Sequence, residues 1–332
     1  MKKTTAICAT LLAGLMSTAA LAETIKPAVV YDFGGRNDRS FNEAAFNGAQ
    51  EFKERTGINY RDFEIQNPSQ REQALRNFAR RGMDPIITIG FAQAAALEKV
   101  AKEFPDTRFA IVDSVVDLPN VRSIVFREEQ GSYLVGMLAA MASETDTISF
   151  VGGMDIPLIR KFSCGYKQGA KAVNPDIEII ENMTGTTGAA WTDPVKGGEL
   201  ARSQFARDSD VVFHAAGATG MGVLQAAADE GKLGIGVDSN QNHLHPGQIL
   251  TSMVKAVDVA VDATLTDAQE GNWSTGVQVM GLAENGVSWA LDDNNADLIN
   301  DEMKAAVEAA KQDIVSGKVE VHDFMVDNTC PF

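Results

Sequence analysis

The chain has 332 residues, of which 45% are hydrophobic, and a formal net charge of −16. The length is about twice that of a typical domain, so the chain can bury two sizeable cores. The acidic balance argues against binding of polyanions such as nucleic acid, and no segment after the N-terminus is long and apolar enough to span a bilayer.

The first 22 residues have the layout of a secretory signal peptide. Two lysines precede an apolar stretch from Ala6 to Met16, and small residues follow up to Ala22. We expect cleavage after Ala22 and export to the periplasm as a soluble protein of 27 basic and 45 acidic residues. Cys8 lies inside the apolar stretch, too early to be a lipidation cysteine at a cleavage site.

Strand and helix patterns alternate along the first part of the exported chain. Short apolar runs recur between amphipathic segments, which predicts βαβ units and a parallel sheet. The expected strands are 27–32, 58–65, 85–89, 108–113 and 121–126, and the expected helices are 40–55, 69–81, 92–103 and 130–143.

The pattern then restarts, and a weak internal repeat accompanies it. Gly34–Gly35 and Gly152–Gly153 each follow an apolar run, with an aspartate close by and a helix after it. Any strand-to-helix corner favours such a pair, which explains part of the likeness. The second set of strands is 147–151, 177–182, 211–214 and 233–237, and its helices are 158–172, 195–207 and 218–229.

The segments after residue 237 suggest that the chain crosses back and forth between two lobes. The expected elements are a strand over 249–254, a helix over 256–270, short strands over 276–282 and 286–290, a helix over 296–315 and a strand over 319–324. We therefore predict two doubly wound α/β lobes joined by a hinge, with a cleft between them. The N-terminal lobe would comprise 23–128 plus about 252–282, and the C-terminal lobe about 129–251 plus 283–332.

The corner after the first strand carries the most informative side chains. Ligands bind at such corners in open α/β sheets, outside the carboxyl ends of the strands. Asn37 and Asp38 could read the edge of a heterocycle, and Phe41 could stack on it. Alternatively they form an Asn–Asp turn and a core phenylalanine. Ser40 and Glu43 match a capping box that would begin the helix.

Further candidates lie at the ends of four later strands. Asp113 and Asp238 each end an apolar run, where a carboxylate can accept hydrogen bonds from hydroxyls or simply form a turn. Lys255 could hold a ribose-like hydroxyl, pair with Asp238 or be solvated. The small-residue turn at Gly217 lacks the ending of a P-loop, so it favours close approach of a neutral ligand, with Phe213 as a second aromatic face.

We expect a binding protein rather than an enzyme, with no cofactor or metal. The chain contains four histidines and shows no nucleophile–base–orienter set and no metal-binding motif. After cleavage only Cys164 and Cys330 remain. Export permits a disulfide between them, and the alternative is two free thiols.

The mature chain resembles the basic membrane protein family of substrate-binding proteins, which includes the purine-nucleoside receptor type. The matching blocks include DFGGRNDRSFN, NVRSIVFREEQGSYLVGMLAA, FVGGMDIPLIRKF, DVVFHAAGATGMGV, GIGVDSNQ and LTSMVK. The resemblance implies a type I periplasmic-binding fold, a monomer, and delivery of a ligand to an ABC permease.

The resemblance also implies roles for single residues. In the nucleoside-binding members two aromatic rings hold the base, which would be Phe41 and Phe213 here. Asn37 and Asp38 would read the base, Asp238 and Lys255 would hold the ribose, and Asp113 would be a further contact. Some relatives bind other ligands, so riboflavin or another small polar molecule is the alternative. A nucleoside hydrolase is disfavoured, because the aspartate cluster of that class is missing.

Overall fold

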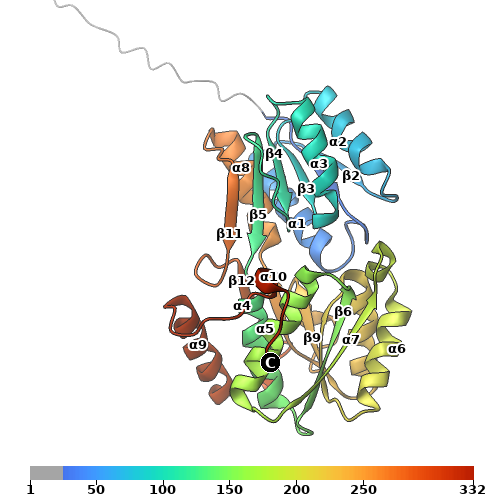
Figure 1. Cartoon of the computed structure of the whole chain (residues 1–332), viewed down its shortest axis with the longest axis vertical. Helices are drawn as coiled ribbons and strands as arrows, with labels where there is room; N and C mark the ends of the chain where they lie inside the picture. The colour runs from blue at the N-terminus through green and yellow to red at the C-terminus, as the bar shows by residue number, and fades with distance from the viewer. Residues whose placement is uncertain (1–24) are drawn as a thin grey trace, which may run out of the picture.

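The structure is a computed structural model that describes residues 25–332. Within them the chain forms two α/β lobes, one above the other in Figure 1, each built on a six-stranded sheet. The expected signal peptide, residues 1–22, lies outside the described residues. Across residues 25–332 no helix combines the length and the apolar character needed to cross a membrane.

The first sheet has the order β11-β5-β4-β3-β1-β2, and all its strands are parallel. Two helices cover each face, so the central strands are apolar on both sides. The strands are β1 (Ala28–Tyr31), β2 (Arg61–Glu64), β3 (Ile86–Ile89), β4 (Phe109–Val112), β5 (Val121–Phe126) and β11 (Gly276–Met280). The helices are α1 (Phe41–Thr56) and α8 (Val257–Glu270) on one face, and α2 (Gln70–Arg80) and α3 (Ala94–Glu103) on the other.

The second sheet has the order β12-β10-β9-β8-β6-β7, in which only β12 runs antiparallel to its neighbour. Its strands are β6 (Thr147–Met154), β7 (Glu178–Gly185), β8 (Val211–Ala215), β9 (Leu233–Asp238), β10 (Ile249–Lys255) and β12 (Val287–Trp289). The helices are α4 (Glu128–Ala142) and α5 (Pro157–Val173) on one face, α6 (Pro194–Phe205) and α7 (Gly220–Asp229) on the other, and α9 (Asp301–Val315) beside α4.

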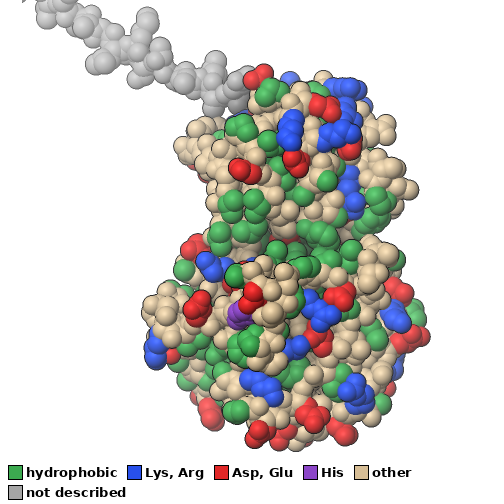
Figure 2. All heavy atoms as spheres, viewed as in Figure 1, with side chains coloured by type: hydrophobic (Ala, Val, Ile, Leu, Met, Phe, Trp, Pro, Cys, Tyr) green, Lys and Arg blue, Asp and Glu red, His purple; other side chains and the backbone are tan. Residues whose placement is uncertain are grey.

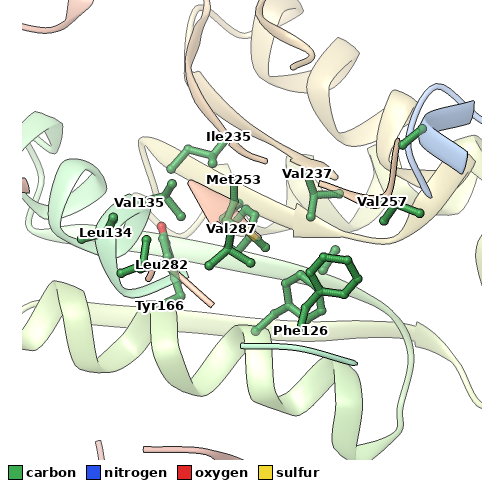
Figure 3. Packing of buried hydrophobic residues seen from close by; sticks show 14 of the residues in the cluster. Phe126, Leu134, Val135, Tyr166, Ile235, Val237, Met253, Val257, Leu282 and Val287 are labelled. Carbon is green, nitrogen blue, oxygen red and sulfur yellow. The ribbon is translucent and has the colours of Figure 1, made fainter. Parts of the chain in front are cut away.

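The core of the second lobe lies between its sheet and the α4–α5 pair. Figure 3 shows Val135 of α4, Tyr166 of α5, Ile235 of β9 and Met253 of β10 meeting in one cluster. The two helices touch through their backbones, since a Cβ atom on Gly165 would lie 2.2 Å from the carbonyl oxygen of Glu129. The fold is therefore the predicted type I periplasmic-binding fold.

The chain passes between the sheets three times. It does so after Phe126, after Lys255 and after Met280, and we call these the first, second and third passages. All of β10 belongs to the second sheet, so the second passage lies beyond the boundary expected near residue 252. The exact division of the chain into lobes otherwise remains a prediction.

The C-terminal tail differs from the sequence-based expectation. The strand expected over 319–324 does not form, and the tail instead contains a short helix, α10 (Phe324–Asp327). Its start is capped by Asp323, whose carboxylate accepts a hydrogen bond from the Met325 backbone at 2.9 Å. A disulfide joins Cys330 to Cys164 of α5, with Cα atoms 5.6 Å apart, and so fastens this tail to the second lobe.

Candidate ligand-binding cleft

A cavity lies between the two lobes. Hydrophobic side chains gather at the waist between the lobes in Figure 2. The carboxyl ends of strands from both sheets line the cavity, as expected for a doubly wound fold. They contribute Asp32, Gly90 and Asp113 from the first sheet, and Ala215, Asp238 and Lys255 from the second.

One part of the cavity wall is polar, and Lys255 is at its centre. The Lys255 ammonium donates a hydrogen bond to Asp113 Oδ2 at 2.6 Å. Asp113 Oδ1 is buried and has no hydrogen-bond partner among the described residues. Asp238 Oδ2 accepts a hydrogen bond from the Ser40 hydroxyl. The wall thus combines one cation with two carboxylates that have room for further donors.

The two aspartates occupy equivalent positions at the ends of β4 and β9. Both have left-handed backbones, with φ of 68° for Asp113 and 63° for Asp238, a conformation that aspartate tolerates better than most residues. Burial raises the pKa of each to about 6, although Lys255 opposes the shift. Burial would lower the pKa of Lys255, but Asp113, Glu128 and Asp238 together raise it. The lysine is therefore charged. The carboxylates around it favour a ligand with hydroxyl groups over a ligand with a negative charge.

Another part of the wall is aromatic. Phe33, Phe41 and Phe91 come from the first lobe, and Phe162 and Trp191 from the second. The Phe41 ring also lies 5.0 Å from the Lys255 nitrogen, a cation–π distance. Rings from both lobes therefore face the same cavity.

Trp191 owes its place to a glycine on a neighbouring strand. A Cβ atom on Gly153 would lie 2.2 Å from the Trp191 ring, so only glycine leaves room for it. The loop before Trp191 is held by hydrogen bonds from the hydroxyls of Thr184 and Thr219 to the Ala190 carbonyl, at 3.1 and 2.8 Å. The indole is thus fixed by contacts from β6, β7 and the turn at Gly217.

Asp38 lines the cavity but also starts α1. Its carboxylate accepts hydrogen bonds from the backbone N–H groups of Ser40, Asn42 and Glu43, at 2.9, 3.0 and 3.0 Å. The capping box expected from Ser40 and Glu43 does not form, since the Ser40 side chain makes no cap hydrogen bond and turns to Asp238 instead. Burial raises the pKa of Asp38, while those three backbone donors oppose the shift.

Six of the predicted site residues line the cavity and two do not. Those in the wall are Asp38, Phe41, Asp113, Gly217, Asp238 and Lys255. Asn37 is exposed in the loop before α1 and is not part of the wall. Phe213 is fully buried, with its ring centroid 5.4 Å from that of Phe150 and 5.3 Å from that of Tyr166.

Side-chain alternation along β8 explains why Phe213 does not face the cavity. Val211 and Phe213 point into the core under α4 and α5, whereas Val212 points to the opposite face of the sheet. The expected role of Phe213 as a stacking ring is therefore wrong. Sequence reasoning missed Trp191, for which the only signal was a tryptophan in a loop of small residues.

The first corner is bonded directly to the second lobe beside the cavity. Gln241 donates a hydrogen bond to the Arg39 carbonyl at 2.7 Å, and the Ser239 hydroxyl donates to the Ser40 carbonyl at 3.2 Å. Behind them, burial lowers the pKa of His214 to about 4, so the neutral ring supports Gln241 at 3.0 Å. His214 thus supports the second lobe's contact with the first corner. Within residues 25–332 no group of three His, Cys, Asp or Glu side chains is placed to hold a metal ion.

Comparison with protein families identifies the chain. The model for the "ABC transporter substrate-binding protein PnrA-like" family, Bmp, matches residues 25–324. The chain belongs to the Bmp family. This confirms the resemblance that the sequence blocks indicated, and with it the general class of ABC transporter substrate-binding proteins.

Individual relatives agree with the family assignment. The chain is 36% identical to the CD4+ T-cell-stimulating antigen of Listeria monocytogenes, over 89% of this chain and 87% of that one. It is 33% identical to the ABC transporter nucleoside-binding protein BmpA of Lactococcus lactis, over 90% and 89%. A solved structure of an ABC transporter solute-binding protein from Aeropyrum pernix superposes with a TM-score of 0.83 at 29% identity, covering 90% and 93% of the two chains.

Proposed function

We propose that this Bmp-family protein binds a nucleoside, preferably a purine nucleoside, in the cleft and delivers it to an ABC permease after export to the periplasm. The observation that carries the proposal is the cavity wall, which joins rings from both lobes to a lysine flanked by two carboxylates. A nucleoside likewise has an aromatic part and a polar part, with a flat base at one end and a sugar carrying hydroxyls at the other.

The base would lie against Phe41 of the first lobe and Trp191 of the second. Stacking on an aromatic ring contributes about 1–3 kcal/mol per base. Trp191 thus takes the role that the sequence suggested for Phe213. Asp38 remains a candidate for the edge of the base, although its oxygens already accept three backbone hydrogen bonds. Gly217 would let the backbone approach the ligand closely.

The ribose would lie at the polar part of the wall. Its hydroxyls can donate to Asp113 Oδ1 and to Asp238, and the Lys255 ammonium can donate to a sugar oxygen. A buried acceptor left without a donor costs about 1–3 kcal/mol, so a free base would bind more weakly than its nucleoside. A nucleotide would bring a phosphate among carboxylates, which is unfavourable.

Three further features belong to the proposal. The first 22 residues would be removed on export. The exported protein would act as a monomer. It would be a carrier and not an enzyme. The nucleoside-binding name of the Lactococcus lactis relative supports the ligand class.

Calorimetry on protein stripped of ligand by unfolding and refolding tests the proposal. We expect inosine, guanosine or adenosine to bind at least about tenfold more tightly than the matching base, because hydrogen bonds to charged groups are lost with the sugar. Trp191→Ala should weaken binding, whereas Trp273→Phe, far from the cavity wall, should not. Absence of binding by every nucleoside would overturn the proposal, and a yellow preparation would indicate a flavin.

A further inference from the structure

A chain of buried charges leads from the cavity to the hinge. Lys255 ends β10 just before the second passage, and Glu128 begins α4 just after the first. The Lys255 nitrogen lies 2.9 Å from Glu128 Oε1, and both side chains are only 1% exposed. Glu128 is not part of the cavity wall. This ion pair therefore ties two passages together and reaches the ligand site only through Lys255.

The other oxygen of Glu128 is held from α5. Lys161 lies 3.0 Å from Glu128 Oε2 and donates a hydrogen bond to the Phe126 carbonyl at 2.7 Å. Burial would raise the pKa of Glu128, but Lys255 and Lys161 together lower it. The carboxylate is therefore ionised and held at both oxygens, so it has little freedom to move.

The Lys255 ammonium is held equally tightly. Three phenylalanine rings surround it, with centroids 5.0, 5.0 and 5.7 Å from the nitrogen, and these are Phe41, Phe126 and Phe162. An ammonium has three N–H bonds. One donates to Asp113, and Glu128 lies at an ion-pair distance of 2.9 Å, so the ammonium keeps a donor for a ligand. Without Glu128, Asp113 would be the one remaining carboxylate within ion-pair distance of the ammonium in the described residues.

We propose that Glu128 is a positioning residue for ligand binding, which holds the Lys255 ammonium where it can donate to the sugar of a bound nucleoside. The inference rests on the proposed function. It assigns a binding role to a residue that lies at the hinge and has no place in the cavity wall. It also requires that substitution of Glu128 weakens binding only when Lys255 is present, and only for ligands that carry the sugar.

The adjacent residue provides a matched control. Glu129 is as buried as Glu128 and also pairs with Lys161, at 3.2 Å, but it does not contact Lys255. Glu128→Gln should lower the affinity for inosine at least about tenfold and change the affinity for hypoxanthine by less than about twofold, since a charge-assisted hydrogen bond is lost only at the sugar. Glu129→Gln should leave both affinities within about twofold.

A double-mutant cycle then separates a positioning role from a general loss of structure. In a Lys255→Met background, Glu128→Gln should cause little further loss of inosine affinity, because residues that act through one contact are not additive. Equal weakening of inosine and hypoxanthine by Glu128→Gln, or a full additional loss in the Lys255→Met background, would overturn the inference. If Glu128→Gln does not fold, Glu128→Asp, which keeps the charge on a shorter side chain, should show the same selective loss.

The same titrations distinguish this inference from the proposed function. If the unmodified protein binds neither inosine nor any other nucleoside, the proposed function fails and the role of Glu128 falls with it. If it binds inosine but Glu128→Gln leaves the ratio of the inosine and hypoxanthine affinities unchanged, only the role of Glu128 is overturned.

Discussion

The Gly34–Gly35 pair follows β1 in the first lobe, and the Gly152–Gly153 pair lies near the end of β6 in the second. The first pair turns the chain, with φ of 107° and 69°. The second pair remains within an extended strand, where its missing side chains make room for others. A Cβ atom on Gly152 would meet Met183, and one on Gly153 would meet the Trp191 ring, each at 2.2 Å.

The same dipeptide therefore supports different walls of one cleft. In the first lobe it leads into the Asp38 cap and the start of α1. In the second it allows a tryptophan from a distant loop to lie against a strand. A likeness in sequence between two corners thus indicated where the cleft lies, but not what each corner contributes to it.

The largest effect is expected from Gly153→Ala. The added Cβ atom would displace the Trp191 ring, so nucleoside affinity should fall about tenfold to a hundredfold, the equivalent of one stacking contact. Calorimetry measures this loss. Gly185→Ala is the control, because its Cβ atom would only touch Ala190 at 3.6 Å. Unchanged affinity in Gly153→Ala would show that Trp191 does not contact the ligand.

The next effect concerns Asp113 and Asp238, the carboxylates at the ends of β4 and β9. These two residues are alike in the two lobes, whereas the glycine pairs differ. Asp113 and Asp238 have pKa values raised to about 6, so they protonate as the pH falls and lose the negative charge that strengthens a hydrogen bond from a hydroxyl donor. Nucleoside affinity should fall about tenfold between pH 7 and pH 5 for each of the two carboxylates, as titration of a group with a pKa near 6 requires. Calorimetry across this range measures it, and tighter binding at pH 5 would contradict it.

The unliganded protein should respond to pH in the opposite direction. Because burial raises these two pKa values, the folded state binds protons that the unfolded chain has already released between about pH 4 and pH 6. These groups therefore make the free energy of unfolding fall as the pH rises through that window. Asp113→Asn and Asp238→Asn should each reduce this dependence in urea unfolding.

A smaller effect is expected from Gly34→Ala. The nearest atoms to an added Cβ are 3.5 Å away, so the substitution causes backbone strain without a clash. It should lower the free energy of unfolding by about 1–3 kcal/mol and weaken nucleoside binding less than Gly153→Ala does. Urea unfolding measures the first effect, with Gly57→Ala, another positive-φ glycine in open space, as the control. Lost binding with unchanged stability would contradict this reading of the corner.

The smallest effect compares two residues at the start of α1. Asp38→Ala should lower the free energy of unfolding by about 0.5–2 kcal/mol, because the helix loses its N-terminal cap. Ser40→Ala should cost less, since its hydroxyl bonds to Asp238 and not to the helix. Thermal unfolding of both variants tests the difference. If Ser40→Ala were the more destabilising, the assignment of the cap to Asp38 would be wrong.

The fold could be predicted from the sequence because its central strands are apolar runs between helices. Helices cover both faces of these strands, so a run such as Ile86–Ile89 is apolar throughout, without alternating polar residues. Such runs are easily recognised in a sequence. The carboxylates of the cleft could be predicted for a related reason. Asp113 and Asp238 are the first polar residues after such runs, and the ends of parallel strands meet at one edge of a sheet.

The aromatic wall could not be predicted, because it depends on distances that the chain order does not fix. Successive side chains of a strand point to opposite faces, and the helices packed on one face of β8 enclose Phe213 in the core. Trp191 is placed by Gly153 and Thr219, which are remote from it in sequence. Asn37 and Asp38 are neighbours in one loop, and only the backbone geometry decides which of them turns inward.

The three passages have a consequence for how the protein is made. β11 completes the first sheet only after every parallel strand of the second sheet has been synthesised, so neither lobe can finish folding from a continuous piece of chain. Pairings between such distant segments slow folding. The topology that builds the hinge therefore delays the completion of both lobes until the C-terminal part of the chain is available.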